Sequence, residues 1–198
     1  MLEFKNVKMA LGHNRMSQPV SVIMEQGEMV CVCGARGCGK SRLLMAVMGL
    51  APVAEGFITI DGEQVGTGAA SYLRRLIAYV PQRLPDNAMR VSELCDTVLA
   101  LEINRAAKTG KEAVLTQWQK LNLSPTLYDC MLSELEDEQL QTILISLLSL
   151  TRRPIILIDS LPDSENVYRF VHELAQNGAE VLYTCEHQSM PCDKLIKL

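Results

Sequence analysis

Eight consecutive residues, 34–41, spell the phosphate-binding pattern G-x-x-x-x-G-K-S. The apolar run 28–33 in front of them predicts a buried strand, and the helix formers 42–49 behind them predict a helix that ends at a glycine. Strand, glycine-rich loop and helix form the context in which this pattern binds phosphate. The segment therefore favours an α/β fold in which the loop joins the end of a strand to the start of a helix.

The residue types within this loop suit a triphosphate. Glycines allow successive backbone N–H groups to curve around phosphate oxygens, and the start of the following helix adds positive potential. Lys40 can reach the β- and γ-phosphates, and the hydroxyl of Ser41 can bind Mg²⁺. A glycine-rich turn that binds nothing is the alternative, and the flanking strand and helix count against it. The residues predicted to contact the nucleotide are Gly34, Arg36, Gly37, Cys38, Gly39, Lys40, Ser41 and Arg42.

The composition restricts the class of protein. A length of 198 residues suits one domain with a sizeable core, and 48% hydrophobic with 21% charged residues is typical of a soluble globular protein. The net charge of −4 disfavours nucleic acid as a partner, and no apolar stretch is long enough to cross a bilayer. Residues 1–5 lack the features of a signal peptide, and the seven cysteines follow no paired C-x-x-C spacing. We therefore expect a cytoplasmic protein with free thiols and without direct membrane insertion.

Strand-like and helix-like segments follow one another in a definite order. Three-to-four spacing of apolar residues predicts several helices between about 91 and 150, and a further amphipathic helix at 166–175. The sequence predicts a single domain over 1–198, with an α/β core and a helical subdomain inserted at about 84–150. The predicted strands are 2–7, 20–24, 28–33, 56–62, 76–80, 155–158, 181–184 and 195–196.

An aspartate at the end of a buried strand provides a second element of a nucleotide site. Four apolar residues, 155–158, lead directly into Asp159, which is the Walker B pattern. A carboxylate at the end of a neighbouring strand can bind a water of a magnesium ion that Ser41 holds. A strand-end aspartate that only caps a turn is the alternative, and it is less favoured beside an intact phosphate loop.

The order of these elements resembles the nucleotide-binding domain of ATP-binding cassette (ABC) proteins over essentially the whole chain. The opening 2–7 is similar to the family's first strand, and the segment 79–82, Tyr-Val-Pro-Gln, resembles its Q-loop. The resemblance implies a P-loop core of the ABC type, with a mixed β-sheet, flanking helices and an inserted helical subdomain, that binds ATP and Mg²⁺. It also implies that Gln82 contacts the metal and the attacking water, so that Ser41, Gln82 and Asp159 form the metal site.

The segment 135–139 departs from the family pattern. Where the family signature reads Leu-Ser-Gly-Gly-Gln, this chain has Leu-Glu-Asp-Glu-Gln. In the family this segment opens a helix whose N-terminus meets the γ-phosphate bound by the partner subunit. The acidic residues from Glu136 to Glu138 favour their own helix through its dipole, but they repel a phosphate. They predict a well-capped helix start rather than a working signature, and a mixed dimer with an ABC paralogue rather than an ATP-bound homodimer.

Three further positions that serve turnover or base binding are altered. Ser160 stands where the family has the glutamate that polarises the attacking water, and a serine has no basic group. Cys185 follows Thr184 where the family's switch histidine is expected. Candidate substitutes are Glu165 and Glu186 for the glutamate, His187 for the switch histidine, and His13 for the adenine-stacking aromatic, which would fall near Leu11.

These features leave three hypotheses for the function. The favoured one is an ABC-type ATP-binding protein that binds Mg-ATP with weak or absent hydrolysis, as the nucleotide-binding subunit of a transporter or related complex. The second is an active ABC transporter ATPase whose substitutions are compensated elsewhere, so the sequence leaves ATPase activity open. The third is a non-catalytic interaction module with a vestigial nucleotide site. By resemblance, a separate membrane subunit would hold the protein at the inner face of the membrane.

Overall fold

The chain forms two compact units, each with an apolar core of its own. The first unit contains residues 1–79, 153–161 and 174–198, and the second contains 80–152 and 162–173. The computed structural model describes residues 1–12, 15–66, 68–84, 88–101, 104 and 110–198. The two units are treated separately below.

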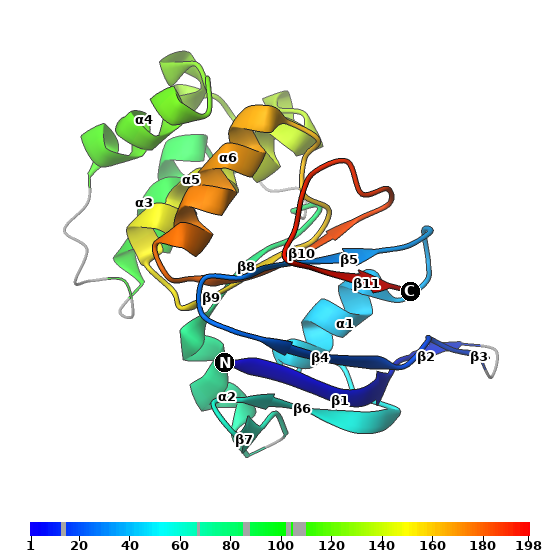
Figure 1. Ribbon diagram of the computed structural model, residues 1–198. Coiled ribbons are helices and arrows are strands. Elements are labelled where there is room, and N and C mark those ends of the chain that lie inside the picture. Colours follow the sequence, from blue (N-terminus) through cyan, green and yellow to red (C-terminus); the bar gives the residue numbers. More distant parts are fainter. Residues whose placement is uncertain (13–14, 67, 85–87, 102–103, 105–109) are drawn as a thin grey trace. The chain divides into compact units, whose positions relative to one another are not determined.

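An antiparallel sheet of four strands begins the first unit (Figure 1). Strand β1 (Leu2–Lys8) pairs with β4 (Val20–Met24) on one side and with β6 (Glu55–Ile60) on the other, and β7 (Glu63–Gln64) continues the sheet beyond β6. Alternation along β1 buries Leu2 and Phe4, as expected for a strand with one face on the core. A short hairpin, β2 (Ala10–Gly12) and β3 (Arg15–Met16), follows β1.

A second sheet in the same unit has the strand order β11-β5-β10-β9-β8. Strand β10 runs parallel to both of its neighbours, β5 and β9, and β11 runs parallel to β5. Both β9 and β10 are buried along nearly their whole length, which is typical of parallel strands covered on two faces. The strands are β5 (Met29–Cys33), β8 (Ile77–Val80), β9 (Ile155–Ile158), β10 (Glu180–Cys185) and β11 (Lys194–Lys197).

Helix α1 (Lys40–Val47) lies between the two sheets and supplies Leu43 and Leu44 to the core of the first unit (Figure 1). It begins two residues earlier than the predicted segment 42–49, inside the phosphate-binding pattern. Its end is the predicted glycine: Gly49 adopts a φ of 67°, and its N–H donates to the carbonyl oxygen of Ala46 at 2.9 Å. The short helical segments α2 (Ala70–Leu73) and η1 (Arg74–Leu76) complete this unit.

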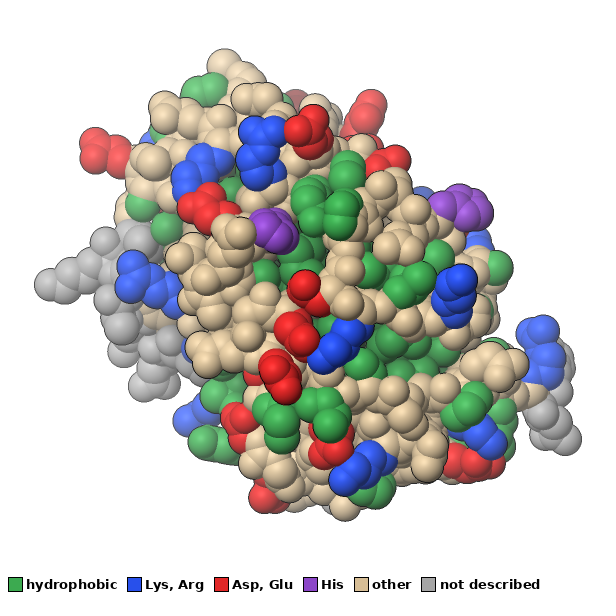
Figure 2. All heavy atoms as spheres, viewed as in Figure 1, with side chains coloured by type: hydrophobic (Ala, Val, Ile, Leu, Met, Phe, Trp, Pro, Cys, Tyr) green, Lys and Arg blue, Asp and Glu red, His purple; other side chains and the backbone are tan. Residues whose placement is uncertain are grey.

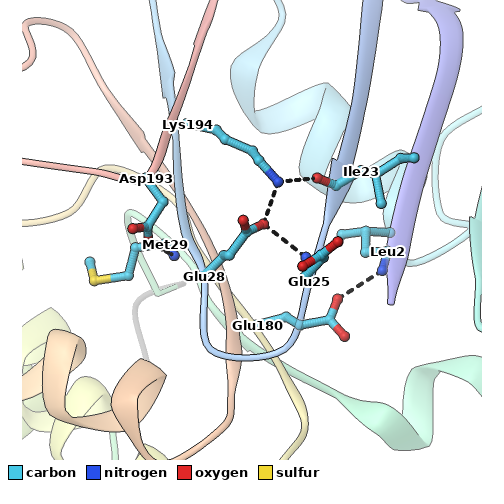
Figure 3. Close-up of polar contacts among 8 residues, drawn as sticks. All are labelled: Leu2, Ile23, Glu25, Glu28, Met29, Glu180, Asp193 and Lys194. Carbon is cyan, nitrogen blue, oxygen red and sulfur yellow. Dashed lines mark hydrogen bonds and ion pairs between the residues drawn. The ribbon is translucent and has the colours of Figure 1, made fainter.

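Polar contacts from the C-terminal part of the chain join the two sheets of the first unit (Figure 3). The buried carboxylate of Glu180 accepts a hydrogen bond from the N–H of Leu2 at 2.8 Å. Lys194 on β11 donates to the carbonyl oxygen of Ile23 at 2.8 Å and pairs with Glu28 at 2.6 Å. The antiparallel sheet is therefore tied to β10 and β11 by side chains as well as by α1.

The second unit is helical around a core that includes Trp118, whose indole N–H donates to the hydroxyl of Ser146 at 3.1 Å. Helix α4 ends at Lys120, and Pro125 begins a 3₁₀ segment, where its missing N–H is tolerated. The elements are α3 (Val91–Ala100), α4 (Lys111–Lys120), η3 (Pro125–Asp129), η4 (Leu132–Glu134) and α5 (Asp137–Thr151). Helix α6 (Glu165–Gln176) matches the predicted amphipathic helix and begins in this unit.

The predicted strands and helices are confirmed, and the structure adds β2, β3 and β7, which are too short to produce a periodic pattern. Among the described residues, none of the helices combines the length and the apolar character that crossing a membrane requires. Acidic and basic side chains are interspersed over the face seen in Figure 2.

Candidate nucleotide-binding site

The phosphate loop connects β5 to α1 in a conformation that only glycine adopts without strain. Gly37 and Gly39 have φ angles of 82° and 108°, in the left-handed region. Gly39 is the N-cap of α1, and its carbonyl oxygen accepts the first helical hydrogen bond from the N–H of Leu43 at 2.8 Å. The loop therefore leads directly into a helix start, where N–H groups and the helix dipole favour an anion.

The lysine of the loop is folded onto the loop itself. The ammonium of Lys40 donates to the carbonyl oxygen of Ala35 at 3.1 Å and to that of Gly34. Lys40 and Ser41 are half-buried, whereas Arg36 and Arg42 are exposed. The ammonium is thus held at the loop by neutral carbonyl groups, for which phosphate oxygens are stronger partners.

Side chains pack closely around this loop. A Cβ atom built on Gly34 would lie 2.7 Å from the Sγ of Cys38, so no larger residue fits at position 34 without movement. A Cβ on Gly39 would lie 2.8 Å from Cδ2 of Leu11, which places Leu11 against the loop. The sequence predicts the base-binding position near Leu11, and this contact puts that residue beside the phosphate loop. The alternative, His13, lies outside the described residues.

Asp159 lies at the end of β9 and is only 6% exposed. Its Oδ1 accepts a hydrogen bond from the hydroxyl of Thr184 at 2.9 Å. Tyr79, on the neighbouring strand β8, also lies close to this carboxylate. Desolvation, together with the negative charge of Asp159, raises the pKa of Tyr79 to about 12, so this phenol stays neutral.

The phosphate loop and Asp159 belong to the same edge of the parallel sheet. Strands β5, β10 and β9 run parallel, so their C-terminal ends lie together. The N–H of Gly34 donates to the carbonyl oxygen of Cys185 at 3.4 Å, and Thr184 on the same strand binds Asp159. The end of β10 therefore contacts both the loop and the aspartate.

These side chains fit a magnesium ion. A hydroxyl from Ser41 and the carboxylate of Asp159 are the hard oxygen donors that Mg²⁺ prefers, and both belong to the first unit. The carboxylate accepts a hydrogen bond from the hydroxyl of Thr184, which holds it at the end of β9. When bound there, the ion would neutralise phosphate charge and orient the nucleotide.

Two predicted elements of the site belong to the second unit. Gln82 is exposed, and its neighbours contact the start of α5: the Gln141 amide donates to the carbonyl oxygen of Pro81 at 3.3 Å, and Arg83 pairs with Asp137 at 2.8 Å. The structure therefore joins the segment that resembles the Q-loop to the segment that resembles the signature.

The helix start at the signature position is satisfied within its own chain. The side-chain oxygen of Gln139 accepts a hydrogen bond from the N–H of Glu136 at 3.1 Å. Asp137 and Glu138 occupy the first turn of α5, and all four residues from 136 to 139 are exposed. The acidic first turn and this cap favour the helix locally, as the sequence predicts.

The altered catalytic positions contain no group placed as a base. Ser160 has a φ of 65°, and its N–H donates to the hydroxyl of Thr184 at 2.7 Å. The Sγ of Cys185 lies 3.2 Å from the Sγ of Cys31, and burial raises the pKa of both thiols, which keeps them neutral. Of the candidate substitutes, Glu165 pairs with Arg169 on α6, while Glu186 and His187 are exposed after β10.

Sequence reasoning missed the roles of Thr184, Tyr79 and Arg83. In the sequence, Thr184 only marked the position before the missing histidine. A threonine in an apolar strand is buried, however, and a fully buried hydroxyl needs hydrogen-bond partners. Tyr79 is half-buried near the end of β8, the strand next to β9, so its hydroxyl also needs a polar partner. No pattern in the sequence indicates the pairing of Arg83 with Asp137, which depends on tertiary structure.

Comparisons with known proteins agree on one family. A family model described as ABC transporter matches residues 17–161, which include the phosphate loop and Asp159. The chain is similar to the ergothioneine transport ATP-binding protein EgtV of Helicobacter pylori (strain G27), at 26% identity over 98% of this chain and 93% of that protein. It is also similar to the uncharacterized ABC transporter ATP-binding protein YphE of Escherichia coli (strain K12), at 27% identity over 96% of this chain and 41% of that protein.

A solved structure supports the same fold. The ATP-binding subunit of an ABC transporter superposes with a TM-score of 0.79 at 20% identity, over 100% of this chain and 85% of that chain. This likeness confirms the predicted α/β fold class. The chain spans less than half the length of the first curated relatives that it matches: the matched part covers 41%, 6% and 36% of those three proteins.

Proposed function

This chain belongs to the ABC transporter family, and we propose that it is a nucleotide-binding subunit that binds Mg-ATP and hydrolyses it weakly or not at all. One observation carries the proposal: an intact phosphate loop and a buried Asp159 share one edge of the sheet, while Ser160 replaces the catalytic glutamate. The loop and Asp159 supply groups suited to holding the nucleotide and its metal, and the serine at position 160 lacks a carboxylate to activate water.

Binding is supported by the local geometry of the loop. Its glycines adopt left-handed conformations, the helix start is open to an anion, and the Lys40 ammonium is already at the loop. Ser41 and Asp159 would hold the magnesium ion, with Gln82 as the third contact that the family resemblance implies. Exposed Arg36 and Arg42 would add positive charge near the phosphates.

Weak hydrolysis follows from the chemistry of the altered positions. A general base must accept a proton near neutral pH, and neither the hydroxyl of Ser160 nor the neutral thiol of Cys185 does so. Glu186 is exposed just beyond β10, so an active ABC ATPase that uses this carboxylate is the alternative to be tested.

The partners that we propose are a separate membrane subunit, an ABC paralogue, or both. The acidic, self-capped start of α5 disfavours contact with a phosphate bound by a second copy of this chain. A paralogue with an intact signature would complete the site at this chain's phosphate loop, in a mixed dimer. We further propose that the complex lies in the cytoplasm, peripheral to the inner face of the membrane.

Binding and turnover should be measured on the full chain and on Lys40→Ala, which removes the phosphate-binding ammonium. We expect the wild-type chain to bind ATP with magnesium, the Lys40→Ala variant to bind at least 10-fold more weakly, and phosphate release by the two to be indistinguishable. Phosphate release well above that of Lys40→Ala would establish the active ATPase instead. Failure of the wild type to bind ATP at millimolar concentration would leave only the interaction module.

The substitution Ser160→Glu tests the cause of weak hydrolysis. Position 160 already holds a non-glycine residue at positive φ, so a glutamate adds little backbone strain. We expect hydrolysis to rise when the mixed dimer is present, with Ser160→Gln as the matched control that lacks a base. If Ser160→Glu and Ser160→Gln have equal activity in that dimer, the missing glutamate is not what limits turnover.

A further inference from the structure

Thr184 is the point at which several parts of the candidate site meet. Its side chain is fully buried at the C-terminal end of β10, in the middle of the parallel sheet. Its hydroxyl contacts Asp159 at 2.9 Å and the N–H of Ser160 at 2.7 Å, and its carbonyl oxygen accepts from the N–H of Leu161 at 2.9 Å. One residue therefore bonds to three consecutive residues after β9.

The direction of these hydrogen bonds is fixed by chemistry. A backbone N–H can only donate, so the hydroxyl of Thr184 must accept from Ser160. The single hydroxyl proton is then free for the Oδ1 of Asp159, and an ionised carboxylate can only accept. The arrangement is therefore complementary to a negatively charged Asp159 in one orientation.

A second hydroxyl reaches the same carboxylate from the other side. Strands β8 and β10 flank β9 in the sheet, and the phenol of Tyr79 on β8 lies close to Asp159. The carboxylate is therefore held between a hydroxyl donor on β10 and a neutral phenol on β8.

We propose that Thr184 and Tyr79 are positioning residues for magnesium, because together they hold the Asp159 carboxylate in the orientation that the metal of a bound nucleotide requires. This inference rests on the proposed function, since it assumes that the chain binds Mg-ATP. Thr184 also relates the carboxylate to the phosphate loop, because the next residue, Cys185, accepts a hydrogen bond from Gly34. The end of β10 therefore connects the metal ligand Asp159 to the phosphate loop.

The test is the contribution of magnesium to nucleotide affinity, defined as the ratio of the dissociation constants measured in EDTA and in excess MgCl₂. The probe is ATP that carries a fluorescent methylanthraniloyl group, titrated into the full chain. The variants are Thr184→Val, which keeps the shape and loses the hydroxyl, Thr184→Ser, which restores it, and Tyr79→Phe. The control is Thr142→Val, because Thr142 is a buried threonine whose hydroxyl donates within α5.

We expect Thr184→Val to lower this ratio about 10-fold, because it removes a hydrogen bond to a charged group, and Tyr79→Phe about 3-fold, because it removes a hydroxyl beside that group. Binding in EDTA should stay within about 2-fold of wild type, and Thr184→Ser and Thr142→Val should keep the wild-type ratio. A purely structural role would weaken binding equally with and without magnesium, and that result would overturn the proposal.

Two outcomes separate this proposal from the proposed function. If the wild type binds no nucleotide in either condition, the proposed function itself fails. If the wild type gains affinity from magnesium and a folded Thr184→Val keeps the whole gain, only the positioning role fails. Should Thr184→Val not fold, Tyr79→Phe decides, and an unchanged ratio for that variant overturns the proposal.

Discussion

Restoring the family signature in this chain should lower the stability of the fold and create an ATP-dependent dimer. The perturbation is the triple substitution Glu136→Ser, Asp137→Gly and Glu138→Gly, which converts the start of α5 to Leu-Ser-Gly-Gly-Gln. Both effects come from removing the negative charge of these three residues. The acidic residues stabilise their own helix start, and they repel the phosphate of a nucleotide bound by a second copy.

The stability cost can be worked out from the contacts at this helix start. Three acidic residues at an exposed N-terminal turn contribute about 0.3–1 kcal/mol each, and the exposed Arg83–Asp137 pair adds less than about 1 kcal/mol. The cap from Gln139 to Glu136 uses a backbone N–H and survives the substitution. The two glycines placed in the first turn add up to about 1 kcal/mol each, so a total loss of about 2–5 kcal/mol should lower the melting temperature by roughly 5–15 °C for a chain of this length.

The gain in association comes from removing like charge. A unit charge about 6 Å from another in water contributes about 0.7 kcal/mol, so three carboxylates near one phosphate group oppose binding by about 2 kcal/mol or more. A symmetric dimer has two such contacts, so the dimer dissociation constant should fall by about 10³-fold. The assay is size-exclusion chromatography with light scattering, with and without Mg-ATP, alongside a thermal melt.

The control is the amide triple Glu136→Gln, Asp137→Asn and Glu138→Gln, which removes the charge without restoring the serine and glycines. We expect this control to lose less stability, because it places no glycine in the helix, and to form less dimer. The reasoning is refuted if the restored signature remains monomeric with Mg-ATP while retaining nucleotide binding. It is also refuted if the unmodified chain already forms an ATP-dependent homodimer.

Three further predictions concern the first unit. Gly56→Ala should lower the free energy of unfolding in urea by at least about 3 kcal/mol more than Gly62→Ala. Both positions have φ near 80° (76° and 81°), but of the two only Gly56 would place a Cβ 2.1 Å from a backbone oxygen. Equal losses for the two variants would refute this. Glu180→Ala should destabilise by about 1–3 kcal/mol because it leaves the buried N–H of Leu2 without its acceptor, while Glu180→Gln, which keeps an oxygen, should lose less in the same assay. Burial raises the pKa of Tyr79 to about 12, above the value of about 10 for an unfolded chain. The stability advantage of wild type over Tyr79→Phe should therefore be complete below about pH 10 and should decline by roughly 1–2 kcal/mol as the pH rises to about 12. Urea unfolding midpoints of both proteins across this pH range test the prediction.

Much of the fold could be predicted from local patterns because the long elements are strongly periodic. The strand before the phosphate loop, the helix after it and the buried α5 all follow from apolar spacing, and Gly49 marks the end of α1. The elements that were not predicted, β2, β3, β7, α2 and η1, are two to four residues long, and a period cannot be read over so few positions. The pairing of strands also lies beyond local patterns, because β10 joins β5 only through residues more than 140 positions apart.

The residues of the candidate site also fall into two groups: those that a motif identifies and those whose contacts depend on tertiary structure. Lys40, Ser41 and Asp159 could be identified because each belongs to a motif that has a chemical reason for its spacing. Thr184 and Arg83 could not be assigned their contacts, since each partner comes from a distant part of the chain. The left-handed conformation of Ser160 could not be predicted either, because serine rarely adopts it and the hydrogen bond from its N–H to Thr184 depends on tertiary structure.

The retained residues of the site differ in how far they can serve as evidence for binding. Asp159 and Thr184 are buried partners, so losing either one would leave an unsatisfied polar group in the core, and their presence is explained by stability as well as by a ligand. Lys40 is half-buried, and the contacts of its ammonium are to the carbonyls of its own loop, so the fold needs this side chain far less. A lysine that contributes little to stability yet lies at the start of a helix is best explained by an anion that binds there. The comparison of wild type with Lys40→Ala therefore measures the function of the loop with little interference from folding.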